Sequence, residues 1–283
     1  MSRWLLPLLV ASAITIDGAY RLIESNGMPD HGVGEFPNPH NPNSIRPQSY
    51  RFRVPLHPVV ASSFTKLGMN PFGVAVNGIP FDPSAAEWWN GDRNSGWQYD
   101  AMGGGRNLGL DASNAHVQPN GAYHYHGIPS GLIVRLGLLP TAHSPIVGWA
   151  GDGFPIYARY GFSDTTGRAT AIADLRSSYR KRRGVRPGGP GGEYDGIFVE
   201  DWQYVAGAGE LDEANGRWCV TPDFPEGTYA YFLTATFPFV PRCWRGTPDD
   251  SFRRGPQGPP PGGRGGPPGR GPGGPPPPRF GRP

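Results

Sequence analysis

Turn-forming residues interrupt this chain so often that only short regular segments fit between them. The 283 residues include 44 Gly and 35 Pro, and Pro fixes φ and lacks the amide hydrogen that ladders and helices need. Segments such as 49–54 and 74–81 alternate in the way of β-strands, the second with an Asn-Gly hairpin signal. The sequence has no βαβ pattern and no dinucleotide-binding fingerprint. It predicts an all-β or β-dominated, sandwich-like domain with long loops and one short helix.

The two ends of the chain differ from its middle. Residues 1–13 combine one Arg, a short apolar run and a small-residue site, as in a secretory signal peptide. The alternative is a buried first strand, because a hairpin signal follows at Asp17-Gly18; the run is too short to span a bilayer. Residues 251–283 hold six Arg and no acidic residue, and we expect them to be disordered. The domain is therefore predicted to span residues 14–250.

The charge of the folded part is acidic, although the whole chain carries a formal charge of +3. Removing the six Arg of residues 251–283 leaves −3 for the rest, so we expect no nucleic-acid binding by the folded body.

Residues 174–183 are the best helix candidate, with Asp174 as N-cap. The basic run 180–186 and the Gly/Pro run after it are interpreted as a solvated insertion.

Residues 121–127 alternate aromatic and imidazole side chains (Gly-Ala-Tyr-His-Tyr-His-Gly). On a β-strand, His124 and His126 would share one face, and Tyr123 and Tyr125 would share the other. Two imidazoles spaced in this way are a natural chelating pair for a transition metal. The alternative is a structural role, in which the ring nitrogens bond to backbone inside a packed sheet.

The preceding turn brings a third histidine into this argument. Residues 119–121 read Pro-Asn-Gly, which favours a three-residue hairpin loop with a bulge at the Gly. In that register His116 faces His124 and joins the two other imidazoles on one patch. A loop one residue longer would move His116 to the other face.

Two more residues are candidate ligands, namely His143 and Asp152. Asp152 lies in a Gly-Asp-Gly turn, where it serves either as a ligand or orienting acceptor, or as a turn residue that bonds its own backbone. Imidazoles with at most one carboxylate suit Cu, Zn or Fe rather than Ca or Mg. The sequence therefore predicts a transition-metal site.

The run Tyr123-His124-Tyr125-His126 resembles the signature of the YHYH domain family. The resemblance extends over roughly residues 14 to 244, through segments 70–78, 87–92, 143–157 and 227–232. It implies an exported protein, secreted or periplasmic. Because no reaction defines the family, the chemistry has to be inferred from the residues.

Two other pairs of residues bear on function or stability. Trp88 and Trp89 stand beside Asn, Asp and Arg and could stack on a glycan or surface polymer, although packing beneath Gly-rich loops is the preferred interpretation. Cys219 and Cys243 are the only cysteines. In an exported chain an even count favours one disulfide; the alternative is two buried thiols.

Three classes of function remain. We favour a non-catalytic metal-binding domain, because no Ser or Cys nucleophile stands beside a base in a recognisable motif. The second class is a metal-dependent enzyme, an oxidoreductase or hydrolase, with Asp152, Tyr123 or Tyr125 as acid/base or radical partner. The third is a metal-free module that binds glycans through Trp88 and Trp89.

Overall fold

The structure, a computed structural model, describes residues 12–168 and 170–254. The predicted signal peptide falls mostly outside the described residues, and so does most of the segment 251–283 that the sequence predicts to be disordered. The described residues up to Arg253 belong to one compact unit. Among the described residues, we find no helix with the length and apolar character that a membrane crossing needs.

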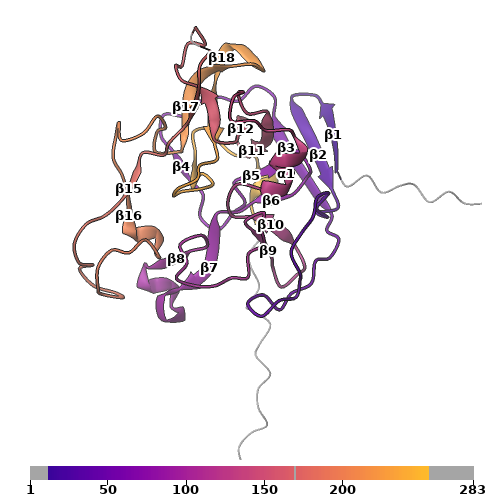
Figure 1. Ribbon diagram of the computed structural model, residues 1–283. Helices are drawn as coiled ribbons and strands as arrows, with labels where there is room; N and C mark the ends of the chain where they lie inside the picture. The colour runs from indigo at the N-terminus through magenta and orange to yellow at the C-terminus, as the bar shows by residue number, and fades with distance from the viewer. Residues whose placement is uncertain (1–11, 169, 255–283) are drawn as a thin grey trace, which may run out of the picture. The chain divides into compact units, whose positions relative to one another are not determined.

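An eight-stranded mixed sheet forms the centre of the fold and confirms the β-dominated prediction. In Figure 1 it runs from β17 and β18 at the top of the view to β9 at the bottom. Neighbours pair antiparallel except β12 with β18 and β6 with β10. In spatial order its strands are β17 (Gly216–Thr221), β18 (Phe224–Phe232), β12 (Pro155–Tyr157), β11 (Ile146–Ala150), β5 (Gly73–Ala75), β6 (Pro80–Phe81), β10 (Tyr123–Tyr125) and β9 (Ala115–Val117).

A three-stranded sheet packs on one face of this large sheet. It consists of β1 (Ser12–Asp17), β2 (Tyr20–Ser25) and β3 (Tyr50–Pro55). Side chains of β2 and β3 form a buried cluster with Val74 and Trp149 of the large sheet, so the two layers are sandwich-like.

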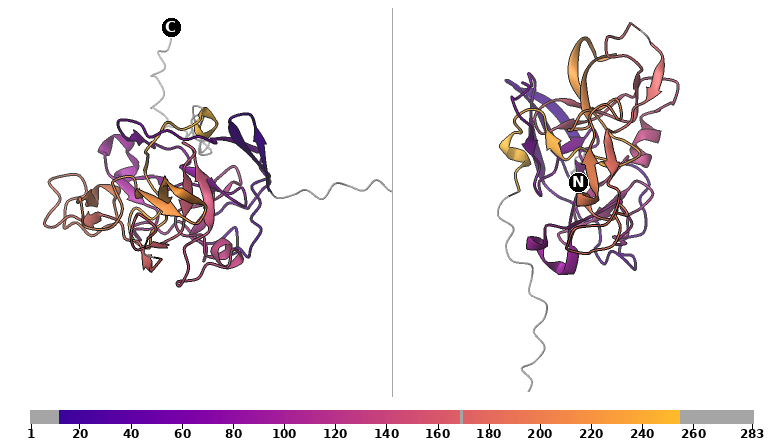
Figure 2. Two further views of the ribbon diagram at one scale, coloured as in Figure 1. Left: turned by 90° about the horizontal axis from the view of Figure 1, so that it is seen from above. Right: turned by 90° about the vertical axis from the view of Figure 1, so that its left-hand side faces the viewer.

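The C-terminal turn η4 (Asp250–Phe252) completes this cluster. Its Phe252 ring is buried and stacks on Phe52 at 4.9 Å. In Figure 2 the yellow C-terminal turn lies near the indigo strands. Apolar burial therefore keeps this turn within the compact unit, which extends to Arg253.

Four two-stranded sheets and short helical turns surround the two layers. Within residues 12–168 and 170–254 the single α-helix is α1 (Ser130–Arg135), whereas residues 174–183 are not helical. The predicted helix there is wrong because tertiary bonds hold the segment extended: Ser178 donates to the Leu211 carbonyl and Tyr179 packs on Phe237. The remaining elements are β4 (Thr65–Lys66), β7 (Ser84–Trp88), η1 (Trp89–Gly91), η2 (Arg93–Ser95), β8 (Gln98–Asp100), β13 (Tyr160–Phe162), β14 (Ile172–Asp174), β15 (Tyr179–Lys181), η3 (Val199–Asp201), β16 (Trp202–Tyr204) and β19 (Cys243–Trp244).

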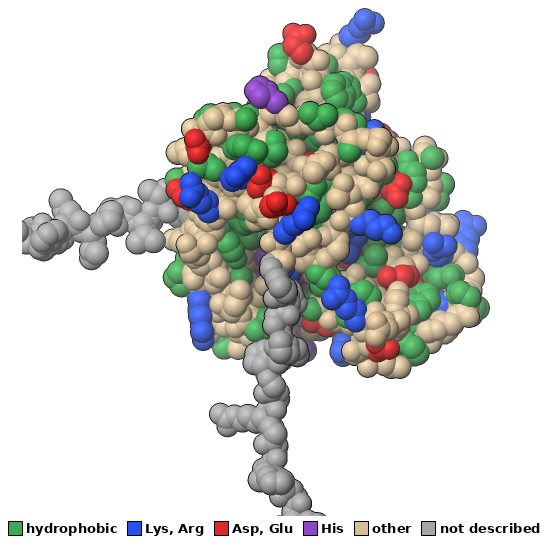
Figure 3. Space-filling view, turned by 180° about the vertical axis from the view of Figure 1, so that it is seen from behind, with side chains coloured by type: hydrophobic (Ala, Val, Ile, Leu, Met, Phe, Trp, Pro, Cys, Tyr) green, Lys and Arg blue, Asp and Glu red, His purple; other side chains and the backbone are tan. Residues whose placement is uncertain are grey.

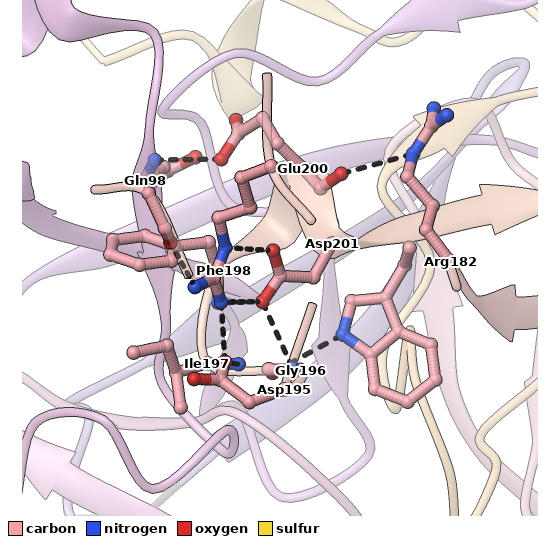
Figure 4. A network of polar contacts seen from close by, with 11 residues as sticks. Gln98, Arg182, Asp195, Gly196, Ile197, Phe198, Glu200 and Asp201 are labelled. Atoms are coloured by element: carbon pink, nitrogen blue, oxygen red, sulfur yellow. Dashed lines mark hydrogen bonds and ion pairs between the residues drawn. The ribbon is translucent and has the colours of Figure 1, made fainter. Parts of the chain in front are cut away.

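A buried ion pair holds the segment that follows β15. Arg186 donates to both carboxylate oxygens of Asp201, at 2.8 and 2.6 Å, and to Asp195 at 2.5 Å. Asp201 also accepts from the Gly196 amide, while Glu200 accepts from the Gln98 amide of β8 (Figure 4). The interpretation of this run as a solvated insertion is therefore wrong at Arg186.

The same bonds set the ionisation of Asp201. Burial opposes ionisation, but hydrogen bonds from Arg186 and from backbone amides outweigh it and hold the pKa of the Asp201 carboxyl below its usual value. Both side chains of the pair are almost fully buried, with exposed fractions of 4% and 0%. Removal of one partner would leave the other charge buried without compensation.

We expect Arg186→Gln to lower the free energy of unfolding by about 3–5 kcal/mol, because breaking a buried ion pair strands its partner. The exposed Arg183 of the same segment supplies the matched control, and Arg183→Gln should change stability by less than about 0.5 kcal/mol. Chemical denaturation measures both. Equal stability of the two variants would contradict the assigned role of the buried pair.

Candidate metal site

The β9–β10 hairpin has the register that the sequence predicts. His124 pairs directly with His116. The Gln118 carbonyl accepts from the Gly121 amide at 2.8 Å, and Gly121 adopts a φ of +88° that L side chains rarely take. The Gln118 amide in turn donates to the Ala122 carbonyl at 2.9 Å, so the three-residue loop is closed on both sides.

This register brings three imidazoles together. His116, His124 and His126 each offer a ligand atom, and these atoms lie within 4.8 Å of one another. The Nε2 atoms of His116 and His126 are 3.1 Å apart. Two nitrogens bound at about 2.0–2.1 Å to one tetrahedral ion would be roughly 3.3 Å apart. The spacing of the cluster is therefore close to that of a chelate.

Backbone carbonyls orient two of these rings. His116 Nδ1 lies 2.9 Å from the Leu108 carbonyl, and His124 Nδ1 lies 3.2 Å from the Ala122 carbonyl. A carbonyl oxygen only accepts, so each Nδ1 carries the proton and each Nε2 carries the lone pair. Metal-binding histidines are usually held in this way by a bond from the second ring nitrogen.

The residues around His116 favour its neutral imidazole, and nearby carboxylates would offset the positive charge of a bound metal ion. Burial lowers the pKa of His116, against opposing effects of the Leu108 carbonyl and of the Glu87, Asp82 and Asp111 carboxylates. A metal ligand must be the neutral imidazole. The carboxylates supply negative charge near the position that a bound ion would take.

Asp82 is a part of this site that the sequence analysis missed. It follows β6 directly, is fully buried, and accepts from Gln118 Nε2 at 3.3 Å. Because β6 pairs with β10, Asp82 lies on the histidine face of the sheet, one residue beyond the pair of Phe81 with Tyr125. The only sequence feature that could have pointed to Asp82 is its position directly after a short apolar strand.

The tyrosines of the signature lie on the opposite face, as alternation requires. Both are fully buried. Tyr123 donates to Asp111 at 2.7 Å, and the Tyr125 hydroxyl lies 2.6 Å from His31 Nε2 and accepts from Asn77 at 3.0 Å. Burial raises the pKa of both phenols above their usual range. They anchor the strand to the core.

The structure does not bring the other two candidate ligands to the triad. The His143 ring packs on Tyr157 at 4.9 Å, and its Nδ1 bonds the Ser144 carbonyl. Asp152 accepts from the Tyr231 hydroxyl at 2.5 Å and the Gly246 amide at 2.8 Å. Burial raises the pKa of Asp152 to about 6. Both residues tie together strands at the other side of the large sheet.

The tryptophan and cysteine candidates are on elements other than the β9–β10 hairpin. Trp88 and Trp89 are half-buried on β7 and η1. Cys219 and Cys243 are free thiols, so the structure does not contain the predicted disulfide. Cys219 belongs to a different buried cluster from the one that Cys243 packs against, which explains why a pairing deduced from cysteine count alone is not formed.

These features define a β-dominated protein with three converging histidines on one hairpin. The family model described as YHYH protein matches residues 51–246, and the chain belongs to the YHYH family. The comparisons with curated proteins and with solved structures found no match.

We expect Tyr125→Phe to lower the free energy of unfolding by about 1–3 kcal/mol, because it leaves buried partners of the hydroxyl without their bond. Tyr204→Phe is the matched control, since Tyr204 is 37% exposed, and its effect should stay within about 0.5 kcal/mol. Thermal and urea unfolding compare the two. An equal loss in both variants would argue against an anchoring role for Tyr125.

Stability should also report the ionisation of Asp152. Its pKa of about 6 lies above the value of about 3.9 in an unfolded chain. The folded state thus binds the extra proton, and the contribution of Asp152 is fully present below pH ~4 and lost as pH rises through ~6. Relative to Asp152→Asn, the wild type should lose roughly 2–3 kcal/mol between pH 4 and 7. The prediction is refuted if the free energies of unfolding of the wild type and of Asp152→Asn change with pH in the same way.

Proposed function

We propose that this protein binds a transition-metal ion through His116, His124 and His126, in a non-catalytic role. The observation that carries the proposal is the convergence of the three ligand atoms within 4.8 Å. Two of the rings present Nε2 because backbone carbonyls hold Nδ1. Three neutral imidazoles would leave one position of a tetrahedral ion for water or another ligand.

The donor set selects the class of ion. Imidazole suits Cu, Zn or Fe, whereas Ca and Mg take mostly oxygen ligands. His124 and His126 are only 3% and 2% exposed, so the ion would be largely shielded from solvent. A shielded site held by a stiff hairpin fits sequestration or metal-stabilised folding of the hairpin.

The positions of the proposed acid/base partners favour binding over catalysis. Tyr123 and Tyr125 lie on the face of β10 opposite the histidines, and Asp152 bonds Tyr231 and Gly246 instead. A metal-dependent oxidoreductase or hydrolase remains the alternative, in which Asp82 or Glu87 would take the role of base. A ligand-accessible ion with turnover would identify that class.

We also propose that the protein is exported, as its first residues suggest. Ser12 and Ala13 begin β1, so cleavage after Ala13 would shorten β1 and leave its pairing from Ile14 onward.

On the face seen in Figure 3, basic and acidic side chains are interspersed. Such a face lacks the extended positive field of nonspecific nucleic-acid binding.

We expect protein purified without a His-tag, or reconstituted after chelation, to bind about one equivalent of Cu, Zn or Fe, since one triad holds one ion. His124→Ala/His126→Ala should lose it. Elemental analysis by mass spectrometry measures the stoichiometry. The control is His57→Ala, because His57 is exposed and lies beside Arg21 and Trp149 rather than at the β9–β10 hairpin.

The result separates the two metal-dependent function classes from the metal-free one. Retention of the metal by the double variant would reject the triad as the site. No metal after reconstitution with each of the three ions would reject both metal-dependent classes. It would direct attention to the glycan alternative, for which Trp88→Ala should abolish binding and His124→Ala should not.

A further inference from the structure

A cavity lies on the side of the molecule formed by β2, β11, β17 and β18. Its volume is about 310 Å³, within the range of small-molecule pockets. The metal triad is on β9 and β10, at the far edge of the large sheet, so the two sites are separate. The residues of the cavity that matter here are Arg21, His57, Trp149, Trp218, Phe224 and Thr228.

Arg21 is a half-buried cation without a counter-ion. It shares a face of β2 with the buried Ile23, so its side chain points toward the large sheet rather than outward. Its guanidinium lies 3.4 Å from the centroid of the Trp149 ring. Nη1 is buried and has no hydrogen-bond partner, and among the described residues no carboxylate forms an ion pair with Arg21.

Such a charge is costly unless something pairs with it. Burial lowers the pKa of Arg21, and no neighbouring acid opposes this effect. Proteins normally pair a desolvated guanidinium with an anion. The residues that line the cavity include Arg21 and His57 but no Asp or Glu, so an incoming anion would meet no like charge there.

The aromatic residues of the cavity add a second recognition element. Trp218 is 61% exposed although it is a large apolar side chain, and it lines the cavity together with Trp149 and Phe224. Gly227 leaves room for the indole, because a Cβ there would lie 3.2 Å from Trp218 Nε1. Exposed indole faces stack on flat, partly apolar rings.

We propose that this cavity binds a carboxylate carried on a ring, with the guanidinium of Arg21 pairing with the carboxylate and the indole of Trp218 packing on the ring. Arginine matches a carboxylate with two parallel hydrogen bonds. Acidic sugars and aromatic acids both have this chemistry. The site goes beyond the proposed metal function and does not depend on it.

Calorimetry on the full-length chain with glucuronate, benzoate and glucose tests the proposal. We expect at least one of the two carboxylates to bind, glucose to bind at least about tenfold more weakly, and added salt to weaken carboxylate binding. Arg21→Met and Trp218→Ala should each reduce affinity about tenfold or more, as loss of a charged hydrogen bond or a stacked ring does. The matched control is Arg51→Met on β3, an arginine that is 67% exposed.

The two carboxylates distinguish the source of the ligand. Binding of glucuronate alone identifies an acidic sugar, binding of benzoate alone identifies an aromatic acid, and binding of both supports the shared ring carboxylate. The proposal is overturned if neither binds, if glucose binds as well as glucuronate, or if Arg51→Met weakens binding as much as Arg21→Met. Because Trp218 is exposed, Trp218→Ala keeps the test valid even where Arg21→Met fails to fold.

Discussion

The pairing of His116 with His124 across the β9–β10 hairpin is the constraint on which the candidate metal site depends. Side chains alternate along a strand, so a slip of β10 by one residue would exchange the faces of its histidines and tyrosines and separate His124 and His126 from His116. The tight Pro-Asn-Gly loop prevents that slip, because Gly121 takes the positive φ that the three-residue loop requires.

Burial on both faces of β10 reinforces this register. The tyrosine face carries bonds from Tyr123 to Asp111 and between Tyr125 and His31, which would all be lost in a shifted strand. The histidine face carries bonds to the Leu108 and Ala122 carbonyls. The alternating signature thus has two effects. The tyrosines hold the strand in the core, and the histidines meet His116 in one cluster.

Arg21 and Arg186 show how differently this fold treats two arginines that leave the solvent. Arg186 is compensated by Asp201 and Asp195 and holds its segment in place. Arg21 has the ring of Trp149 and, in the described part of the chain, no carboxylate partner. A compensated charge is structural, whereas an uncompensated one beside a cavity supplies the free energy for an anionic ligand.

The sequence by itself determined the features that rest on local geometry. Turn chemistry and a period of two predict the β class, the hairpin, its register and the convergence of His116 with His124 and His126, because these depend on neighbours within about ten residues. Only the tertiary structure decided which distant segments meet. It placed Asp82 at the triad, His31 at Tyr125, and His143 and Asp152 elsewhere. It also left both cysteines free and turned a predicted helix into strands. Those outcomes depend on packing between segments far apart in the chain, which local propensity does not encode.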